Sequence, residues 1–222
     1  MIRLLRDKQW THWEDTAFQA MCHTFPSTLV DLGTGDGKFP YLMAREDETR
    51  LCLGVDAQTA GFSHFAWKGA RKPSRGGLVA QNLFYLQADL PDLPPGLKGM
   101  ADVITLRLPW AGLLREAILP SEGFLKMLKG LSKPNAWVIF QLNVSIFKDP
   151  SYVERLNLPA FDAAYREAVL EPAYLQAGFS FWDDPNPPEA LTPFLKPTSW
   201  QQRLHHGDQQ RKTQTLMLKH RD

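Results

Sequence analysis

The fold is decided by one stretch of the sequence, Val30-Asp31-Leu32-Gly33-Thr34-Gly35-Asp36-Gly37. It completes a predicted strand over residues 28–32, and the glycines after that strand let the backbone turn tightly and approach a ligand at the start of a helix. The spacing is not the G-x-G-x-x-G of dinucleotide-binding proteins. Asp36 falls in the first helical turn, where its carboxylate would repel a pyrophosphate. The stretch therefore favours a ligand with a cationic amine over a dinucleotide.

A second acid, Asp56, ends the next predicted strand, 23 residues after Gly33. At that place an acid can accept hydrogen bonds from both hydroxyls of a ribose. The glycine stretch and Asp56 together resemble motif I of class I S-adenosylmethionine (SAM) methyltransferases. The resemblance implies SAM as the cofactor, with Asp31 near the methionine amine and Asp56 on the ribose.

Short apolar segments alternate with helical ones along the chain, which is typical of a parallel sheet with crossover helices. We predict an α/β fold of the class I, Rossmann-like methyltransferase type. It has a mostly parallel sheet of seven strands with an antiparallel last strand, and helices on both faces. The expected strands cover residues 28–32, 51–56, 83–86, 101–108, 136–142, 179–182 and 213–218, and the main helices residues 58–70 and 121–131.

The domain organisation follows from where this alternation breaks. We expect residues 1–222 to form a single methyltransferase domain with an N-terminal extension over residues 1–25, made of a hairpin and a helix. Residues 145–170 and 183–212 are expected to be inserts before and after the sixth strand. Both inserts fall where loops at the sheet edge carry function.

The third predicted strand ends shortly before Asp89, where this fold usually places an acid or amide against the adenine amino group. Asp92 is the alternative acid. The complete set of residues expected to bind SAM is Asp31, Gly33, Thr34, Gly35, Asp36, Asp56, Ala88 and Asp89.

The composition excludes disordered tails, collagens and disulfide miniproteins, since 44% of the residues are hydrophobic and 22% are charged. The two cysteines lack metal-ligand spacing, so no metal site is expected. The first residues are interrupted by charge, and no uncharged run is long enough for a membrane span. We therefore expect a cytoplasmic protein without a membrane partner. The net charge of +1 argues at first against nucleic acid as a partner.

The distribution of charge argues the other way. Residues 68–75 carry four bases and no acid, and residues 203–221 carry five bases against the single acid Asp208. Both segments are expected on the cofactor side of the fold, where they would contact phosphates. The basic residues predicted to contact RNA are Lys68, Arg71, Lys72, Arg75, Arg203, Arg211 and Lys212.

The fourth strand leads into Leu108-Pro109-Trp110 at the mouth of the predicted SAM site. Methyltransferases that act on exocyclic amines often place an Asn or Asp here, whereas this chain offers Leu108 and an aromatic face. A ring nitrogen such as adenine N1 already holds an in-plane lone pair and needs only positioning. A Trp face stacks a base and favours the positive charge that develops on it. We predict Trp110, Trp200 and Pro109 as the catalytic residues, with one extruded base between the two indoles.

The family resemblance rests on four motifs that occur in order along the chain. They are Asp31 to Gly37, Lys72-Pro73-Ser74-Arg75-Gly76-Gly77-Leu78, Pro109-Trp110-Ala111-Gly112-Leu113-Leu114 and Trp200-Gln201-Gln202-Arg203-Leu204. Together they resemble the aminoglycoside-resistance 16S rRNA methyltransferases of the Kam/Npm type. The resemblance implies SAM-dependent methylation of N1 of adenine 1408 in 16S rRNA, on the assembled 30S subunit. It also implies resistance to aminoglycosides that contact this adenine. We also expect the protein to be a monomer.

The resemblance has two departures. Counted back from Trp110, the adenine-binding acid of the family falls near Pro91, so Asp89 requires a small register shift. Asp208 stands where members of the family tend to be basic, which leaves Arg211 as the replacement. Three alternatives stay open at this point: a tRNA guanine-N7 methyltransferase, a small-molecule methyltransferase, and a SAM-binding ribosome factor without catalysis.

Overall fold

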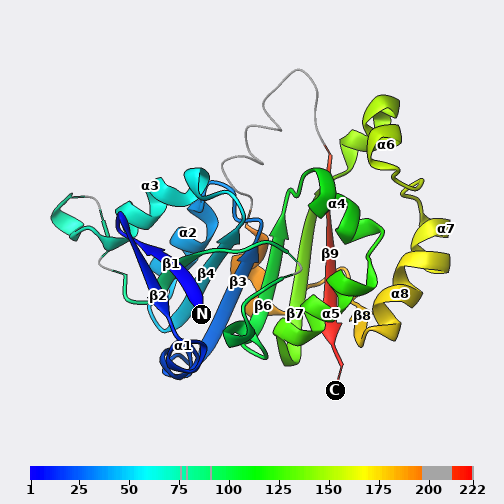
Figure 1. The fold of residues 1–222 in the computed structure, drawn as a ribbon. Helices are drawn as coiled ribbons and strands as arrows, with labels where there is room; N and C mark the ends of the chain where they lie inside the picture. The colour runs from blue at the N-terminus through cyan, green and yellow to red at the C-terminus, as the bar shows by residue number, and fades with distance from the viewer. Residues whose placement is uncertain (76, 79, 91, 197–211, 222) are drawn as a thin grey trace.

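The computed structural model describes residues 1–222 except 76, 79, 91, 197–211 and 222. The strands of the described residues form one sheet in the order β2-β1-β5-β4-β3-β6-β7-β9-β8 (Figure 1). Their bounds are β1 Ile2–Arg6, β2 Gln9–Trp13, β3 Ser27–Leu32, β4 Arg50–Asp56, β5 Leu83–Gln87, β6 Ala101–Arg107, β7 Ser132–Asn143, β8 Phe179–Phe181 and β9 Thr213–His220. The strands from β5 to β7 are parallel, and β9 is antiparallel to both neighbours. The predicted α/β fold with an antiparallel last strand is confirmed.

The N-terminal hairpin enlarges the sheet beyond the seven strands expected. β1 pairs antiparallel with β5, where Leu4 lies opposite Leu86. Ile2, Leu4 and Leu5 of β1 are buried, so the hairpin adds to the core as well as to the edge of the sheet. The partner strand lies some eighty residues further along the chain. Local sequence patterns therefore predict the hairpin but not its pairing.

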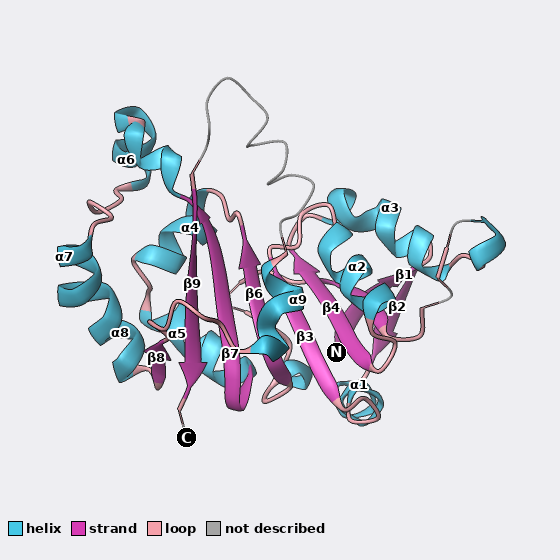
Figure 2. Cartoon of the chain, turned by 180° about the vertical axis from the view of Figure 1, so that it is seen from behind, coloured by secondary structure: helices cyan, strands magenta, loops and turns pink. Residues whose placement is uncertain are grey.

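Helices cover both faces of the sheet. Two separate hydrophobic clusters lie on the two sides, one with α2, α3 and α9, and the other with α1, α4, α5 and α8 (Figure 2). The bounds are α1 Asp15–Cys22, α2 Lys38–Glu46, α3 Thr59–Ala70, α4 Ala111–Ile118, α5 Glu122–Leu131, α6 Pro150–Leu156, α7 Ala163–Tyr165, α8 Glu171–Gln176 and α9 Thr192–Leu195. α4 was not predicted from the sequence, although the buried residues of this helix, Leu114, Ala117 and Ile118, recur at helical spacing. No helix in the described part of the chain is long and apolar enough to cross a membrane.

The two predicted inserts contain helical segments. Residues 145–170 hold most of a 3₁₀ turn (Val144–Lys148), α6, α7 and a π-helical turn (Arg166–Leu170) that continues into α8. Residues 183–212 hold a 3₁₀ turn (Glu189–Leu191) and α9 before the segment that lies outside the described residues. The first insert reaches the top of the sheet near the start of α4 (Figure 1).

Candidate active site

The glycine loop after β3 has the backbone conformation that its sequence predicts. Gly33, Gly35 and Gly37 have φ values of 65°, 56° and 71°, in the left-handed region that favours glycine. A Cβ on Gly61 of α3 would lie 2.3 Å from the carbonyl oxygen of Gly35. The loop therefore turns tightly and is closely backed by α3, which leaves its other side open to a ligand.

Asp31 lies at the base of the loop and is only 2% exposed. Its carboxylate accepts hydrogen bonds of 2.7 Å from the hydroxyls of Thr34 and Thr105. Burial raises the pKa of Asp31 to about 6, although the two hydroxyl donors act in the opposite direction. A buried carboxylate of this kind is a strong acceptor for a ligand cation.

Asp56 holds the loop from the neighbouring strand. Its Oδ2 accepts a 2.9 Å hydrogen bond from the N–H of Gly35, and its Oδ1 accepts one of 2.9 Å from the N–H of Gln58. These bonds fix the carboxylate beside the loop, at the carboxyl end of β4. This is the place from which an acid reaches the hydroxyls of a ribose.

Two cavities meet at Gly33. The first, of about 340 Å³, is lined by Asp31, Gly33, Thr34, Gly35, Asp36, Lys38, Phe39, Arg107, Leu108 and Trp110. The second, of about 370 Å³, is lined by Gly33, Asp56, Ala57, Ala88, Asp89, Leu90, Gly112, Leu113, Glu116, Ser121 and Phe124. All eight residues predicted to bind SAM line one or the other. The lining of the second cavity includes Asp89 but not the alternative acid, Asp92. The residues expected at the aminoacyl end of SAM line the first cavity, and those expected at its adenosine line the second.

Trp110 stands at the first cavity and is 49% exposed, whereas the other tryptophans in the described residues are half-buried. It precedes α4 on a strained turn, because Leu108 and Ala111 have φ values of 49° and 47°. The N–H of Leu108 donates to the carbonyl of Gln141 (2.7 Å), and the N–H of Ala111 donates to the hydroxyl of Tyr152 (3.2 Å). Surrounding structure therefore holds the turn that presents the indole. Pro109 is buried and does not line the cavity.

Three predicted residues, Trp200, Arg203 and Arg211, lie outside the described residues. The sandwich of two indoles therefore stays a prediction.

The first cavity also contains two cations that were not predicted from the sequence, Lys38 and Arg107. A signal for Arg107 was present, because it lies near the carboxyl end of the predicted strand over residues 101–108, on the same face as Thr105.

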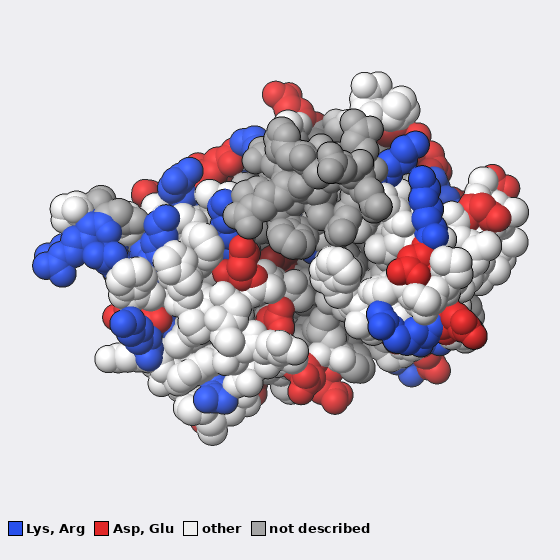
Figure 3. All heavy atoms as spheres, turned by 90° about the horizontal axis from the view of Figure 1, so that it is seen from above, with Lys and Arg blue, Asp and Glu red and all other residues white. Residues whose placement is uncertain are grey.

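The described part of the predicted RNA-binding set lies mainly after α3. Lys72 and Arg75 are exposed, while the guanidinium of Arg71 lies 4.2 Å from the ring centroid of Trp67 and the ammonium of Lys68 lies 5.3 Å from that of Tyr41. Figure 3 looks down on the carboxyl ends of the parallel strands and shows Lys and Arg side chains gathered at the end of the molecule where Figure 1 places this segment. Acidic side chains lie nearer the centre. Lys212 is exposed at the start of β9.

No three His, Cys, Asp or Glu side chains of the described residues come together in a group that could hold a metal ion.

The fold, the glycine loop and the paired cavities define a class I SAM-dependent methyltransferase. Residues 3–219 match the model of the NpmA family, described as 16S rRNA (adenine(1408)-N(1))-methyltransferase. A protein of that name from Streptoalloteichus tenebrarius is 32% identical over 208 residues, which cover 92% of both chains. The chain therefore belongs to the 16S rRNA (adenine(1408)-N(1))-methyltransferase family.

Solved structures agree with this assignment. The 16S rRNA methyltransferase KamB has a TM-score of 0.81 and 30% identity, with 100% of both chains covered. A mutant 16S rRNA (adenine(1408)-N(1))-methyltransferase from Catenulisporales acidiphilia, solved with cosubstrate SAM, has a TM-score of 0.82 and 26% identity, covering 100% of this chain and 98% of that one. The predicted family, the enzyme class, the SAM cofactor and RNA as the partner are confirmed.

Proposed function

We propose that this enzyme methylates N1 of adenine 1408 within the assembled 30S subunit, as a monomer in the cytoplasm, and so confers resistance to aminoglycosides that contact this adenine. The observation that carries the proposal is the exposed indole of Trp110 at the cavity that Asp31 also lines. This arrangement offers a stacking surface for a base beside the aminoacyl end of the cofactor. Family membership supports the same reaction.

The site suits a ring nitrogen as the methyl acceptor. SAM supplies an electrophilic methyl group on a sulfonium. Trp110 offers a π face on which the base stacks and which stabilises the positive charge that moves onto the base. Adenine N1 loses no proton, so the site needs no general base. Asp31 is already committed to two hydroxyl donors in the floor of the cavity.

The target base must leave the helical stack before it reaches Trp110, because N1 lies on the pairing edge of adenine. Trp200 is the proposed second face of the sandwich, and Pro109 is proposed to hold Trp110 in position. The cofactor contacts proposed above for Asp31, Gly33, Thr34, Gly35, Asp36, Asp56, Ala88 and Asp89 complete the site.

The basic residues are proposed to dock the enzyme on phosphates of folded rRNA. Lys68, Arg71, Lys72 and Arg75 belong to one basic segment of the sequence, and Arg203, Arg211 and Lys212 belong to the other. Figure 3 shows Lys and Arg side chains of the described residues at the end of the molecule where Figure 1 places the segment after α3. Binding through two basic segments far apart in the sequence is proposed to suit a folded RNA surface such as that of the assembled subunit.

The test compares three substrates with radiolabelled SAM: purified 30S subunits, free 16S rRNA and bulk tRNA. We expect transfer to 30S subunits and at least tenfold less to the other two. Equal methyl transfer to free 16S rRNA and to 30S subunits would contradict the proposal that the assembled subunit is the substrate. Preferential methyl transfer to tRNA would contradict the proposal that rRNA is the substrate. Sedimentation of the free enzyme at its monomer mass is expected in the same buffer.

A further inference from the structure

Arg107 is the last residue of β6, and its side chain lines the cavity that also contains Asp31. The guanidinium lies 4.0 Å from the ring centroid of Phe39 in α2. Its Nη1 donates to the carbonyl of Phe194 (2.7 Å), and its Nη2 donates to the carbonyl of Lys196 (2.8 Å). Contacts from two sides therefore fix the planar cation in the wall of the cavity.

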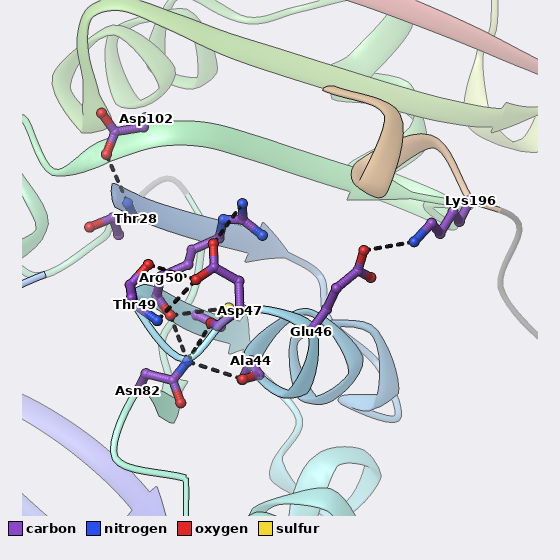
Figure 4. A network of polar contacts seen from close by, with 10 residues as sticks. Thr28, Ala44, Glu46, Asp47, Thr49, Arg50, Asn82, Asp102 and Lys196 are labelled. Atoms are coloured by element: carbon purple, nitrogen blue, oxygen red, sulfur yellow. Dashed lines mark hydrogen bonds and ion pairs between the residues drawn. The ribbon is translucent and has the colours of Figure 1, made fainter. Parts of the chain in front are cut away.

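The segment that holds Arg107 is itself anchored. Phe194 is buried, with the guanidinium of Arg50 4.8 Å from its ring centroid. The ammonium of Lys196 forms a 2.7 Å ion pair with Glu46 at the end of α2 (Figure 4). Arg107 is thus held by carbonyls whose own positions are set by α2 and the sheet. This arrangement orients the guanidinium in advance of any ligand.

The cofactor presents opposite charges to this cavity. The aminoacyl end of SAM carries an ammonium and a carboxylate on the same carbon, so its binding site needs both an anion and a cation. Asp31 supplies the anion at the floor. Burial lowers the pKa of Arg107 to about 10, and the nearby carboxylate of Asp31 raises it, so the guanidinium stays charged at neutral pH. A partly buried guanidinium that lines a cavity favours a carboxylate ligand.

We propose that Arg107 binds the α-carboxylate of SAM, while Asp31 takes the α-amine. Lys38, in the first turn of α2, is the other cation that lines the cavity. The guanidinium is favoured because its planar fork matches a carboxylate and because Phe39 and two carbonyls already orient it. The inference concerns how SAM binds and does not depend on which RNA is methylated.

Calorimetry with SAM and with decarboxylated SAM, which lacks only the α-carboxylate, tests this assignment without RNA. The wild type is expected to bind SAM about 10- to 100-fold more tightly than decarboxylated SAM, the range for hydrogen bonds to a charged group. Arg107→Met is expected to bind SAM about 10- to 100-fold more weakly than the wild type and to bind decarboxylated SAM with the wild-type affinity. This variant should therefore bind the two ligands equally well. Lys38→Met, the matched control, is expected to keep the wild-type preference for SAM over decarboxylated SAM.

Each other outcome contradicts the proposal in a recognisable way. If Arg107→Met keeps the preference for SAM, or if Lys38→Met abolishes it, the carboxylate is bound elsewhere. Equal weakening of both ligands by Arg107→Met would mean that Arg107 only shapes the cavity. The unchanged affinity expected for decarboxylated SAM also shows that the variant is folded. Failure of the wild type to bind SAM would overturn the cofactor site, whereas failure to methylate 30S subunits with normal binding would affect only the proposed function.

Discussion

Asp31 and Thr105 lie opposite each other on the parallel strands β3 and β6, and the hydroxyl of Thr105 donates a 2.7 Å hydrogen bond to Oδ1 of Asp31. Thr34 donates to the other carboxylate oxygen. Two neutral donors orient the carboxylate, and the guanidinium of Arg107, which lines the same cavity, is close enough to lower the pKa of Asp31. The cavity therefore offers a ligand both an anion and a cation.

The affinity for SAM should depend on the protonation of Asp31. Burial raises its pKa to about 6 in the free enzyme, and a protonated carboxyl cannot compensate an ammonium. We expect the Kd for SAM to rise as the pH falls from 7 to 5, with proton release on binding in that range. Asp31→Asn should bind weakly with a flat profile. Calorimetry between pH 5 and 8 checks this, and a flat wild-type profile would contradict the role of Asp31.

Removal of the exposed indole should affect methyl transfer more than cofactor binding. Loss of one stacked base contact costs about 1–3 kcal/mol, so Trp110→Ala should lower kcat/KM for 30S subunits about 5- to 150-fold. Trp110→Phe should lose less, and the Kd for SAM should stay near the wild-type value in both. Trp137→Phe is the control, because Trp137 packs edge-on against Trp182 away from the cavity. Normal transfer by Trp110→Ala would rule out base stacking on this residue.

The left-handed turn that presents Trp110 should restrict which side chains position 111 accepts. Ala111 has a φ of 47°, a conformation that a β-branched residue adopts only at a cost. Ala111→Val should lower the free energy of unfolding by about 1–3 kcal/mol, whereas Ala111→Gly should leave it within about 1 kcal/mol of the wild type. Urea denaturation of both variants makes the comparison. Equal stability of the two would show that the turn relaxes freely.

The segment after α3 should contribute to RNA docking through charge. Replacement of Arg71, Lys72 and Arg75 by Glu should weaken 30S binding and reduce the slope of log K against log salt by about 0.7–0.9 per lost phosphate contact. The triple variant Lys98→Glu, Lys126→Glu and Lys129→Glu is the control for the change in net charge, since all three residues are exposed outside this segment. An unchanged slope in the first triple variant would remove the segment from the docking surface.

The cofactor site is largely predictable from the sequence because its parts are local. Three glycines after an apolar strand adopt positive φ, and Asp31 and Asp56 lie at the carboxyl ends of adjacent parallel strands, on the two sides of the glycine loop. The parallel sheet with crossover helices follows from the alternation of segments along the chain. These features need no knowledge of distant contacts.

The remaining features depend on contacts between distant parts of the chain. The pairing of β1 with β5 joins segments some eighty residues apart, and Arg107 is held by carbonyls of residues 194 and 196. The positive φ values of Leu108 and Ala111 contradict the local preference of both residues, so the turn at Trp110 is imposed by the surrounding structure. The sequence predicts that Trp110 lies at the mouth of the SAM site, but it does not predict the strained turn that exposes the indole.

Primer extension on 16S rRNA from 30S subunits, treated with the enzyme and SAM, tests the central claim most directly. Methylation of adenine N1 blocks the pairing edge, so reverse transcriptase should stop at adenine 1408 after treatment with the wild type and only weakly after treatment with Trp110→Ala. Incorporation of labelled methyl groups without a stop at this nucleotide, or a stop at another position, would contradict methylation of N1 of adenine 1408.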